Sequence, residues 1–275
     1  MNTSSEILKI ENLSKNFGGL RAVRGMEMVI PQGSLFGLIG PNGAGKTTIF
    51  NLITGIYGLT SGQILFNGNP INGYEPFEIN QMGIARTFQN IRLFPNLTVL
   101  DNVRIAYHGH AGYSFSDALF RSRKFEAKEK EMADQAIEFL SVFNLQDRIH
   151  EVAKNLPYGE QRRLEIARAL AAYPKLLLLD EPAAGMNPNE AVALMDLIHF
   201  IRERFNLTIL LIEHQMQVVM GVCEMITVMD FGEKIAFGTP AEIQSNPRVI
   251  EAYLGPGASA LAEKFKRRKT ENVTN

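Results

Sequence analysis

A glycine-rich stretch of this chain runs Gly40-Pro41-Asn42-Gly43-Ala44-Gly45-Lys46-Thr47. It matches the pattern Gly-x4-Gly-Lys-Ser/Thr, which is typical of a loop that binds nucleotide phosphates. Glycines let such a loop curl until several backbone N–H groups point at phosphate oxygens. The apolar segment Ser34–Ile39 precedes the loop, and Thr47–Thr54 has the pattern of a helix, whose positive N-terminal end attracts phosphate. The sequence therefore predicts a strand, a phosphate loop and a helix in that order.

Three side chains at the end of this loop have expected roles toward a nucleotide. We expect Lys46 to reach the β- and γ-phosphates, Thr47 to ligate Mg²⁺ and Thr48 to contact the α-phosphate. The other residues expected to cradle the phosphates are Asn42, Gly43, Ala44 and Gly45. ATP and Mg²⁺ are the expected ligands, and a glycine-rich turn without a ligand is the alternative.

Further along the chain, strand and helix patterns alternate. Leu176–Leu179 is an apolar run typical of a buried parallel strand, and Thr208–Ile212 is the next one. Between them, Asn187-Pro188-Asn189-Glu190 offers an N-cap, a proline at the first helical position and an acidic residue at the third. Apolar residues then recur at helical spacing up to Phe205. This alternation predicts an α/β fold, with a parallel sheet covered on both faces.

Two other regions have a different pattern. Residues 7–39 contain short β segments separated by turns, such as the one at Phe17-Gly18-Gly19. From about Gln89 to Ala172 the pattern is helical, and Arg121–Glu131 is densely charged, as a solvated helix face usually is. The apolar residues that follow at helical spacing are Ala133, Ile137, Leu140 and Val142 or Phe143. This stretch therefore predicts a helical subdomain inserted into the α/β core.

Acidic residues and a histidine follow the two buried strands. The first strand ends in Asp180-Glu181-Pro182, at the edge where α/β sheets bind ligands. We expect Asp180 to hold Mg²⁺ through water and Glu181 to polarise the attacking water. A helix-capping turn is the alternative, which the upstream phosphate loop disfavours. The second strand ends in Glu213-His214, and a lone histidine there is more often structural.

The composition of the chain narrows the class of protein. Its 275 residues suffice for one large domain or two modest ones, and an apolar content of 45% supports a buried core. A net charge of −1 argues against a nucleic-acid-binding surface spread over the molecule. The single cysteine, Cys223, cannot form an internal disulfide, and we expect it to be buried and inert in a reducing cytosol.

The sequence also bears on membranes. No signal peptide is visible, and no apolar run approaches the ~20 residues that cross a bilayer. We therefore expect a partner to supply any membrane-spanning part. The tail 255–275 is small, polar and basic, with Lys-Phe-Lys-Arg-Arg-Lys at residues 264–269. We expect it to be disordered, and contact with anionic lipid is the alternative.

With the phosphate loop, the Asp180-Glu181 pair and His214 in this order, residues 6–254 resemble the ABC transporter ATPase family. The resemblance implies a P-loop NTPase core with an N-terminal antiparallel β subdomain and an inserted α-helical subdomain at about residues 90–172. It also implies that Phe17 stacks on adenine and that Gln89 contacts Mg²⁺ and senses the γ-phosphate. His214 would then orient the γ-phosphate as a donor.

The signature motif of that family has its counterpart at Leu156-Pro157-Tyr158-Gly159-Glu160-Gln161, which leads into an expected helix Arg162–Ala171. In the family, this motif of one subunit closes on the ATP held by the other. The common form is Leu-Ser-Gly-Gly-Gln, so the serine hydroxyl that usually reaches the facing γ-phosphate is missing here. The backbone N–H of Gly159 and the helix N-terminus remain as donors. We therefore expect Tyr158 and Gly159 to contact the nucleotide of a partner subunit.

The departures match one branch of the family. Phe-Gly-Gly-Leu-Arg-Ala-Val at 17–23, Arg-Thr-Phe-Gln-Asn-Ile-Arg-Leu-Phe at 86–94 and Glu-Pro-Ala-Ala-Gly-Met-Asn-Pro at 181–188 resemble the larger ATP-binding subunit of bacterial branched-chain amino-acid importers. This implies a peripheral protein on the cytoplasmic face of the inner membrane. Its partners would be transmembrane permease subunits, a second ATPase subunit (identical or a smaller paralogue) and, indirectly, a periplasmic or extracellular substrate-binding protein. Leu93, Phe94 and Leu97 would line a groove for a permease helix, or be plain core.

Three other classes remain open from the sequence. The ATPase of another transporter, such as a lipopolysaccharide exporter, shares part of the loop pattern but fits the Pro157-Tyr158 signature less well. Soluble ABC ATPases of translation or repair usually carry two ATPase halves or a long coiled-coil insert. A small nucleotide kinase would lack the signature helix and the Asp180-Glu181-Pro182 strand end.

Overall fold

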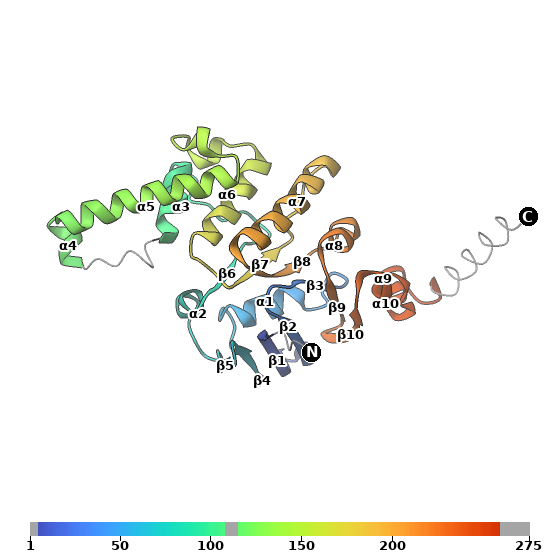
Figure 1. The fold of residues 1–275 in the computed structure, drawn as a ribbon. Helices are drawn as coiled ribbons and strands as arrows, with labels where there is room; N and C mark the ends of the chain where they lie inside the picture. Colours follow the sequence, from blue (N-terminus) through green and yellow to red (C-terminus); the bar gives the residue numbers. More distant parts are fainter. Residues whose placement is uncertain (1–4, 108–114, 259–275) are drawn as a thin grey trace, which may run out of the picture.

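The computed structural model describes residues 5–107 and 115–258, and it contains two sheets (Figure 1). The first is antiparallel, with strand order β2-β1-β4-β5. Its strands are β1 (Glu6–Phe17), β2 (Leu20–Pro31), β4 (Ser61–Phe66) and β5 (Asn69–Pro70). The turn expected at Phe17-Gly18-Gly19 joins β1 and β2, but the short segments expected on either side are two strands of 12 residues each. The long pairing of the hairpin, with several bulges, extends both strands.

The second sheet has six strands in the order β10-β9-β3-β8-β7-β6. All neighbouring strands in it are parallel except β10, which pairs antiparallel with β9. Its strands are β3 (Leu35–Ile39), β6 (Ile84–Arg86), β7 (Leu176–Asp180), β8 (Thr208–Ile212), β9 (Met225–Asp230) and β10 (Glu233–Gly238). The strands expected before the phosphate loop, before Asp180-Glu181 and before Glu213 are therefore confirmed as β3, β7 and β8.

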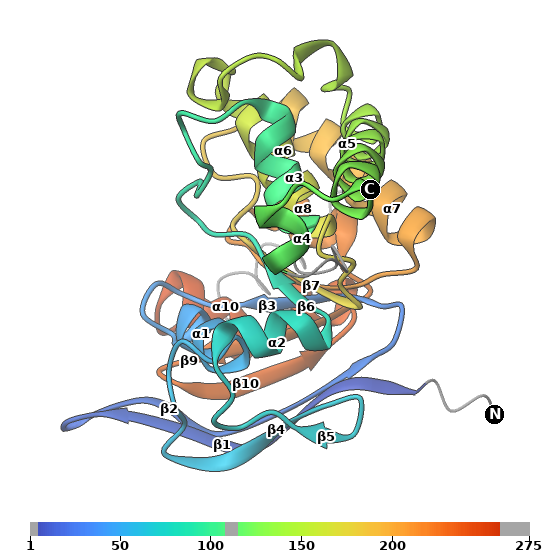
Figure 2. The same cartoon turned by 90° about the vertical axis from the view of Figure 1, so that its left-hand side faces the viewer.

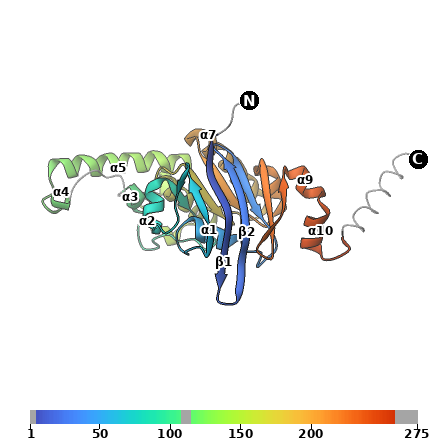
Figure 3. The ribbon, with the colours of Figure 1, turned by 90° about the horizontal axis from the view of Figure 1, so that it is seen from below.

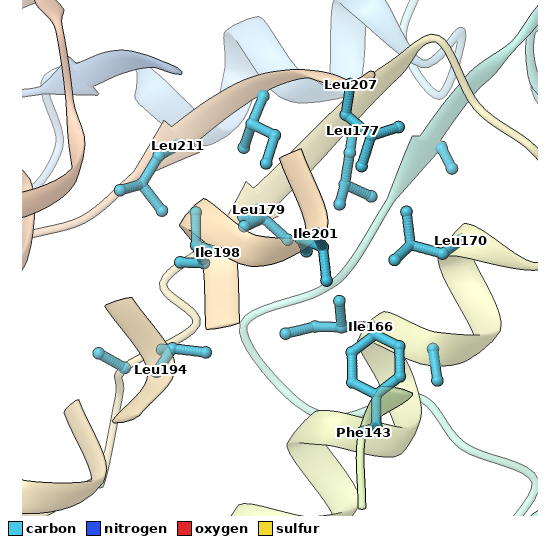
Figure 4. Close-up of a cluster of buried hydrophobic side chains, with 14 of the residues drawn as sticks. Phe143, Ile166, Leu170, Leu177, Leu179, Leu194, Ile198, Ile201, Leu207 and Leu211 are labelled. Atoms are coloured by element: carbon cyan, nitrogen blue, oxygen red, sulfur yellow. The ribbon is translucent and has the colours of Figure 1, made fainter. Parts of the chain in front are cut away.

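Alternating side chains of this sheet belong to two separate cores. Leu177 and Leu179 of β7 join the core formed with the helices, whereas Leu176 and Leu178 join the core on the other face. Figure 4 shows the first core, where side chains of α6 (Tyr158–Leu170) and α7 (Pro188–Phe205) meet those of β7 and β8. The second face packs on α1 (Lys46–Ile53) and the antiparallel sheet (Figure 2). Helices thus cover one face, and a helix plus a sheet cover the other.

The helical insert expected after Gln89 contains α3 (Val99–Tyr107), α4 (Phe115–Leu119), α5 (Arg123–Val142) and α6. Figure 3 shows α4 and α5 extending to one side of the molecule. The buried face of α5 consists of Met132, Ala136, Phe139 and Leu140. Of the residues expected at helical spacing, Leu140 and Phe143 are buried, whereas Ala133, Ile137 and Val142 are half-buried. Two short 3-10 turns, Gln146–Arg148 and Ala153–Asn155, join α5 to α6.

Two helix starts bear on the site. Helix α6 begins at Tyr158 after Pro157, four residues before the expected start at Arg162, so Tyr158 and Gly159 form its first turn. Helix α7 begins as expected, because the Asn187 side chain accepts hydrogen bonds from the backbone of Asn189 and Glu190, both at 3.0 Å. Glu190 completes the capping box.

The remaining helices are short: α2 (Pro76–Met82), α8 (Met216–Val222), α9 (Pro240–Ser245) and α10 (Pro247–Leu254). Helices α9 and α10 lie on the side opposite to α4 and α5 (Figure 3). The basic run 264–269 of the tail lies outside the described residues. In the described parts of the chain, no helix combines the length and apolar character that a membrane-spanning segment needs.

Candidate functional site

The phosphate loop is held by backbone contacts that tolerate only glycine at two positions. Gly40 has φ 151°, and a Cβ there would lie 2.1 Å from the carbonyl oxygen of Met229. Gly45, at the start of α1, has φ 101°, and a Cβ there would lie 2.6 Å from the carbonyl oxygen of Ala22. These contacts leave no room for a side chain. The loop is therefore clamped between β9 and β2 in the curled form that the sequence predicts.

Lys46 lies at the centre of the loop. Its Nζ donates to the carbonyl oxygens of Gly40 at 2.7 Å and Pro41 at 2.9 Å. Burial lowers the pKa of Lys46, while the nearby carboxylates of Glu181 and Asp180 oppose that shift. The loop thus holds a buried ammonium close to the two acidic residues that follow β7.

The other residues of the loop differ in their exposure to solvent. Asn42, Gly43 and Thr47 are exposed, and Thr48 is half-buried, so their polar groups are accessible to a ligand. Ala44 is buried, and its N–H donates to the carbonyl oxygen of Pro41 at 3.2 Å.

Asp180, the last residue of β7, is buried beside a cation that the sequence analysis did not single out. Nη2 of Arg86, at the end of the neighbouring strand β6, lies 2.7 Å from Oδ2 of Asp180. Nη1 of Arg86 donates to Oδ1 of Asn51, on helix α1, at 2.6 Å. The carboxylate is therefore tied to strand β6 and, through the arginine, to the helix that follows the phosphate loop.

Glu181 brings three of the predicted site residues together. Its Oε2 accepts a hydrogen bond from Nε2 of Gln89 at 2.8 Å and lies 3.4 Å from Nδ1 of His214. Its φ of 47° is left-handed, which costs free energy for a residue with a side chain. The hydrogen bond from its N–H to the carbonyl oxygen of Ile212, at 2.9 Å, holds this backbone in place. Strain at such a position is typical of functional residues.

Glu213, a buried residue for which the sequence predicts no role, holds the loops after β7 and β8 together. Oε1 of Glu213 accepts from the N–H of Ala183 at 2.8 Å, two residues beyond Glu181. Its Oε2 accepts from the N–H groups of His214 at 2.9 Å and Gln215 at 3.2 Å. The sequence signal that could have identified Glu213 is its position: a carboxylate at the end of a buried strand, next to His214. Glu213 therefore fixes the backbone on both sides of the Glu181–His214 contact.

Phe17 lies at the exposed end of β1 and is not a core residue. Its side chain is 40% exposed and meets the Tyr57 ring edge to face, with the ring centroids 5.2 Å apart. Nζ of Lys15 lies 4.9 Å from the Phe17 centroid. An exposed aromatic face of this kind can stack on a planar base.

Tyr158 and Gly159 lie in the first turn of α6, apart from the phosphate loop. The ring of Tyr158 is 45% exposed, and its Cε1 would lie 3.6 Å from a Cβ on Gly185, in the loop after Glu181. Its hydroxyl lies 3.3 Å from Nη2 of Arg162. Within the described residues, no hydrogen bond or ion pair joins these two residues to the phosphate loop of the same chain.

The donor groups of the phosphate loop, of the segment after β6 and of the end of β7 fit a nucleotide with Mg²⁺. The carboxylate of Asp180, the hydroxyl of Thr47 and the amide of Gln89 offer the oxygen ligands that Mg²⁺ prefers. Lys46 and the curled loop offer positive charge and N–H groups to phosphates. This fold and this site define a P-loop ATPase. The chain belongs to the ABC transporter family, whose sequence model matches residues 23–184.

A second family model, described as "Branched-chain amino acid ATP-binding cassette transporter", matches residues 233–255. The chain is 44% identical to the "High-affinity branched-chain amino acid transport ATP-binding protein BraF" of Pseudomonas aeruginosa over 92% of its length and 99% of the relative's. It is 43% identical, with the same coverage, to the "High-affinity branched-chain amino acid transport ATP-binding protein LivG" of Escherichia coli. These matches confirm the family and the ATPase activity predicted from the sequence.

The fold is similar to that of solved members of the family. An ATP-binding cassette of an ABC transporter in its ADP conformation superimposes with a TM-score of 0.79 at 33% identity. The match covers 91% of this chain and 99% of that one. The P-loop core with its antiparallel sheet and helical parts, predicted above, is thereby confirmed.

Proposed function

We propose that this chain is the ATP-binding and ATP-hydrolysing subunit of an importer of leucine, isoleucine and valine. The relatives named for branched-chain amino-acid transport, 43% and 44% identical over 92% of the chain, support this cargo. The observation that carries the activity is the convergence of Gln89 and His214 on one carboxylate oxygen of Glu181, beside the Lys46 loop. We further propose residues 6–254 as the ATPase domain, with the helical subdomain inserted at about 90–172.

The phosphate loop and the end of β1 bind ATP. The Lys46 ammonium, now held by two carbonyl oxygens of the loop, turns to the β- and γ-phosphates when they enter. The phosphate cradle comprises Asn42, Gly43, Ala44, Gly45, Thr47 and Thr48. Phe17 stacks on the adenine ring through its exposed face.

Hydrolysis falls to the residues at the strand ends. Asp180, Thr47 and Gln89 hold Mg²⁺, which supplies charge neutralisation at the phosphates when bound. Glu181 orients and polarises the attacking water, because a hydrogen bond to Ile212 holds its backbone and contacts with Gln89 and His214 hold its carboxylate. His214, 51% exposed beside Glu181, donates to the γ-phosphate.

A second ATPase subunit completes the site. Tyr158 is exposed and Gly159 is half-buried on the helical part, and neither contacts its own phosphate loop through the hydrogen bonds described above. We place them against the nucleotide of the second subunit, with the N–H of Gly159 and the start of α6 as donors. That subunit is a second copy or a smaller paralogue.

Contact with the membrane goes through permease subunits, with the chain bound at the cytoplasmic face of the inner membrane. The groove proposed for a permease helix includes Phe94 and Leu97, which are 45% and 36% exposed, and Leu93, which packs against the core. A periplasmic or extracellular substrate-binding protein delivers the amino acid to the permease. ATP binding closes the two ATPase subunits and hydrolysis releases them, which moves the permease between states.

Uptake of labelled amino acids tests this function. Cells that lack the gene for this chain should lose high-affinity uptake of leucine, isoleucine and valine. The wild-type gene should restore uptake, and a Glu181→Gln gene expressed at the same level should not. Undiminished uptake in the deletion strain, with loss of another solute's transport instead, would contradict the cargo.

A further inference from the structure

The helix that begins at the signature segment carries a buried ion pair. Nη1 of Arg162 lies 2.8 Å from Oε2 of Glu165, and the two side chains are 0% and 1% exposed. Nε of Arg162 is buried without an acceptor among the described residues. Because taking charges out of water is costly, an apolar pair of similar size often stabilises a fold as well or better. Stability alone therefore does not account for this pair.

Both partners of the pair hold the backbone of the segment that carries Gln89. The two Nη atoms of Arg162 donate to the carbonyl oxygens of Phe88 at 2.6 Å and Gln89 at 2.8 Å. Oε1 of Glu165 accepts from the N–H groups of Phe88 at 3.4 Å and Arg92 at 3.0 Å. The planar guanidinium and the carboxylate thus fix residues 88–92 against α6 through main-chain groups.

The same contacts extend to the proposed hydrolytic site and to the signature residue. Gln89 donates to Glu181 at 2.8 Å, and Arg162 contacts the Tyr158 hydroxyl at 3.3 Å. A continuous series of polar contacts therefore runs from Glu181 through Gln89 and Arg162 to Tyr158. Its ends are the acidic residue of one nucleotide site and the exposed aromatic ring that we place at the other.

We propose that Arg162 and Glu165 are positioning residues that lock the Gln89 segment to the signature helix, so that Gln89 and Tyr158 move as one body. The proposal rests on the proposed function, which puts Gln89 at the chain's own nucleotide and Tyr158 at its partner's. When Gln89 shifts toward a bound nucleotide, the locked backbone carries the start of α6 with it. The presence of nucleotide in one site is thereby transmitted to the surface that closes on the other.

A double-mutant cycle on ATP hydrolysis by the full chain tests this coupling. Arg162→Lys keeps the charge but loses the fork that holds two carbonyls. We expect it to lower kcat about tenfold while the KM for ATP changes less than about twofold. In a Gln89→Ala background, the same substitution should change kcat less than about twofold, because the side chain it positions is gone. A further loss of about tenfold in that background would overturn the proposal.

The neighbouring arginine supplies a matched control. Nη1 of Arg163, on the same helix, donates to the carbonyl oxygen of Phe143 at 3.1 Å, within the helical part. Arg163→Lys therefore perturbs α6 without releasing residues 88–92, and kcat should stay within about twofold of wild type. An equal loss of activity in Arg163→Lys and Arg162→Lys would overturn the specific role of the pair.

Hydrogen exchange provides a second readout that does not depend on activity. Glu165→Gln removes the charge that holds Arg162, so the amides of Phe88 and Arg92 should exchange at least about tenfold faster. Exchange in the core strand β8 should stay as in wild type. Unchanged exchange at residues 88–92 would overturn the proposal. If Arg162→Lys does not fold, the exchange measurement on Glu165→Gln takes the place of the kinetic test. Lack of ATP hydrolysis in the wild-type chain would instead contradict the proposed function.

Discussion

Nη2 of Arg86 lies 2.7 Å from Oδ2 of Asp180, and their side chains are only 5% and 4% exposed. The carboxylate that we propose as a Mg²⁺ ligand is thus neutralised by a cation from the adjacent strand in this structure. Nη1 of the same arginine donates to Asn51 on α1 at 2.6 Å. Arg86 therefore links the end of β7 to the helix that follows the phosphate loop.

Removal of Arg86 should leave a buried carboxylate without its counterion. We expect Arg86→Ala to lower the free energy of unfolding by about 3–5 kcal/mol, measured by urea denaturation without nucleotide. Arg148→Ala is the control, because Arg148 forms ion pairs with Glu151 and Glu160 and is 39% exposed. It should cost at most about 1 kcal/mol. Equal losses of unfolding free energy in the two variants would show that the Arg86–Asp180 pair contributes little to stability.

Loss of Lys46 should weaken nucleotide binding. Its ammonium makes charge-assisted hydrogen bonds worth about 1.5–3 kcal/mol to a charged partner. Lys46→Ala should therefore raise the Kd for ATP by about 10–100-fold, measured by calorimetry. Lys9→Ala, which removes a surface lysine paired with Glu11 on β1, should leave the Kd unchanged. An unaltered Kd in Lys46→Ala would remove this residue from the site.

The cap of α7 should tolerate an aspartate in place of Asn187. The Asn187 side chain accepts two backbone hydrogen bonds at 3.0 Å, which a carboxylate can also accept. Asn187→Asp should leave the free energy of unfolding within about 0.5 kcal/mol of wild type, whereas Asn187→Ala should lower it by about 1 kcal/mol. Equal stability of the aspartate and alanine variants would contradict a capping role.

The thiol of Cys223 should be unreactive in the folded protein. Burial raises the pKa of Cys223 from 9.0 to about 12, so the thiol stays protonated at pH 8. Iodoacetamide should label Cys223 at pH 8 only after unfolding in guanidinium. The raised pKa also means that the folded state keeps the proton between pH 9 and 12 while the unfolded state loses it.

The contribution of the protonated Cys223 thiol to the free energy of unfolding is complete below pH 9. It is lost as the pH rises toward 12, at up to about 1.4 kcal/mol per pH unit. Cys223→Ala should make the decline between pH 9 and 11 less steep, measured by urea unfolding at each pH. An identical decline in both proteins, or rapid labelling of the folded wild-type protein, would contradict the burial of the thiol.

Elements with strong local signals could be predicted from the sequence. The strand, phosphate loop and helix at 34–54 follow from glycine spacing beside an apolar run, and the start of α7 follows from Asn187, Pro188 and Glu190. For helix α5 the apolar spacing predicts a helix but does not determine which of its apolar residues are buried. Its apolar stripe includes both Met132 and Ala133, and both Ala136 and Ile137, so spacing alone does not locate the centre.

The polar partners at the site could not be predicted in the same way. Arg86 and Asp180 are 94 positions apart, and Arg162 is 74 positions from Phe88. Such contacts depend on which strands become neighbours in the sheet and on where α6 packs, and neither is encoded by local pattern. The start of α6 was also missed, because Pro157 caps it without a side-chain hydrogen bond and Gly159 weakens the helical pattern.

The most direct test is ATP turnover by the purified full chain with Mg²⁺, wild type against Glu181→Gln. The amide keeps the size of the carboxylate but cannot polarise water as a base. We predict that the variant binds ATP with a Kd within about threefold of wild type, while kcat falls by at least about 100-fold. Near-normal turnover in Glu181→Gln would contradict the assignment of Glu181, and with it the account of the site at the end of β7.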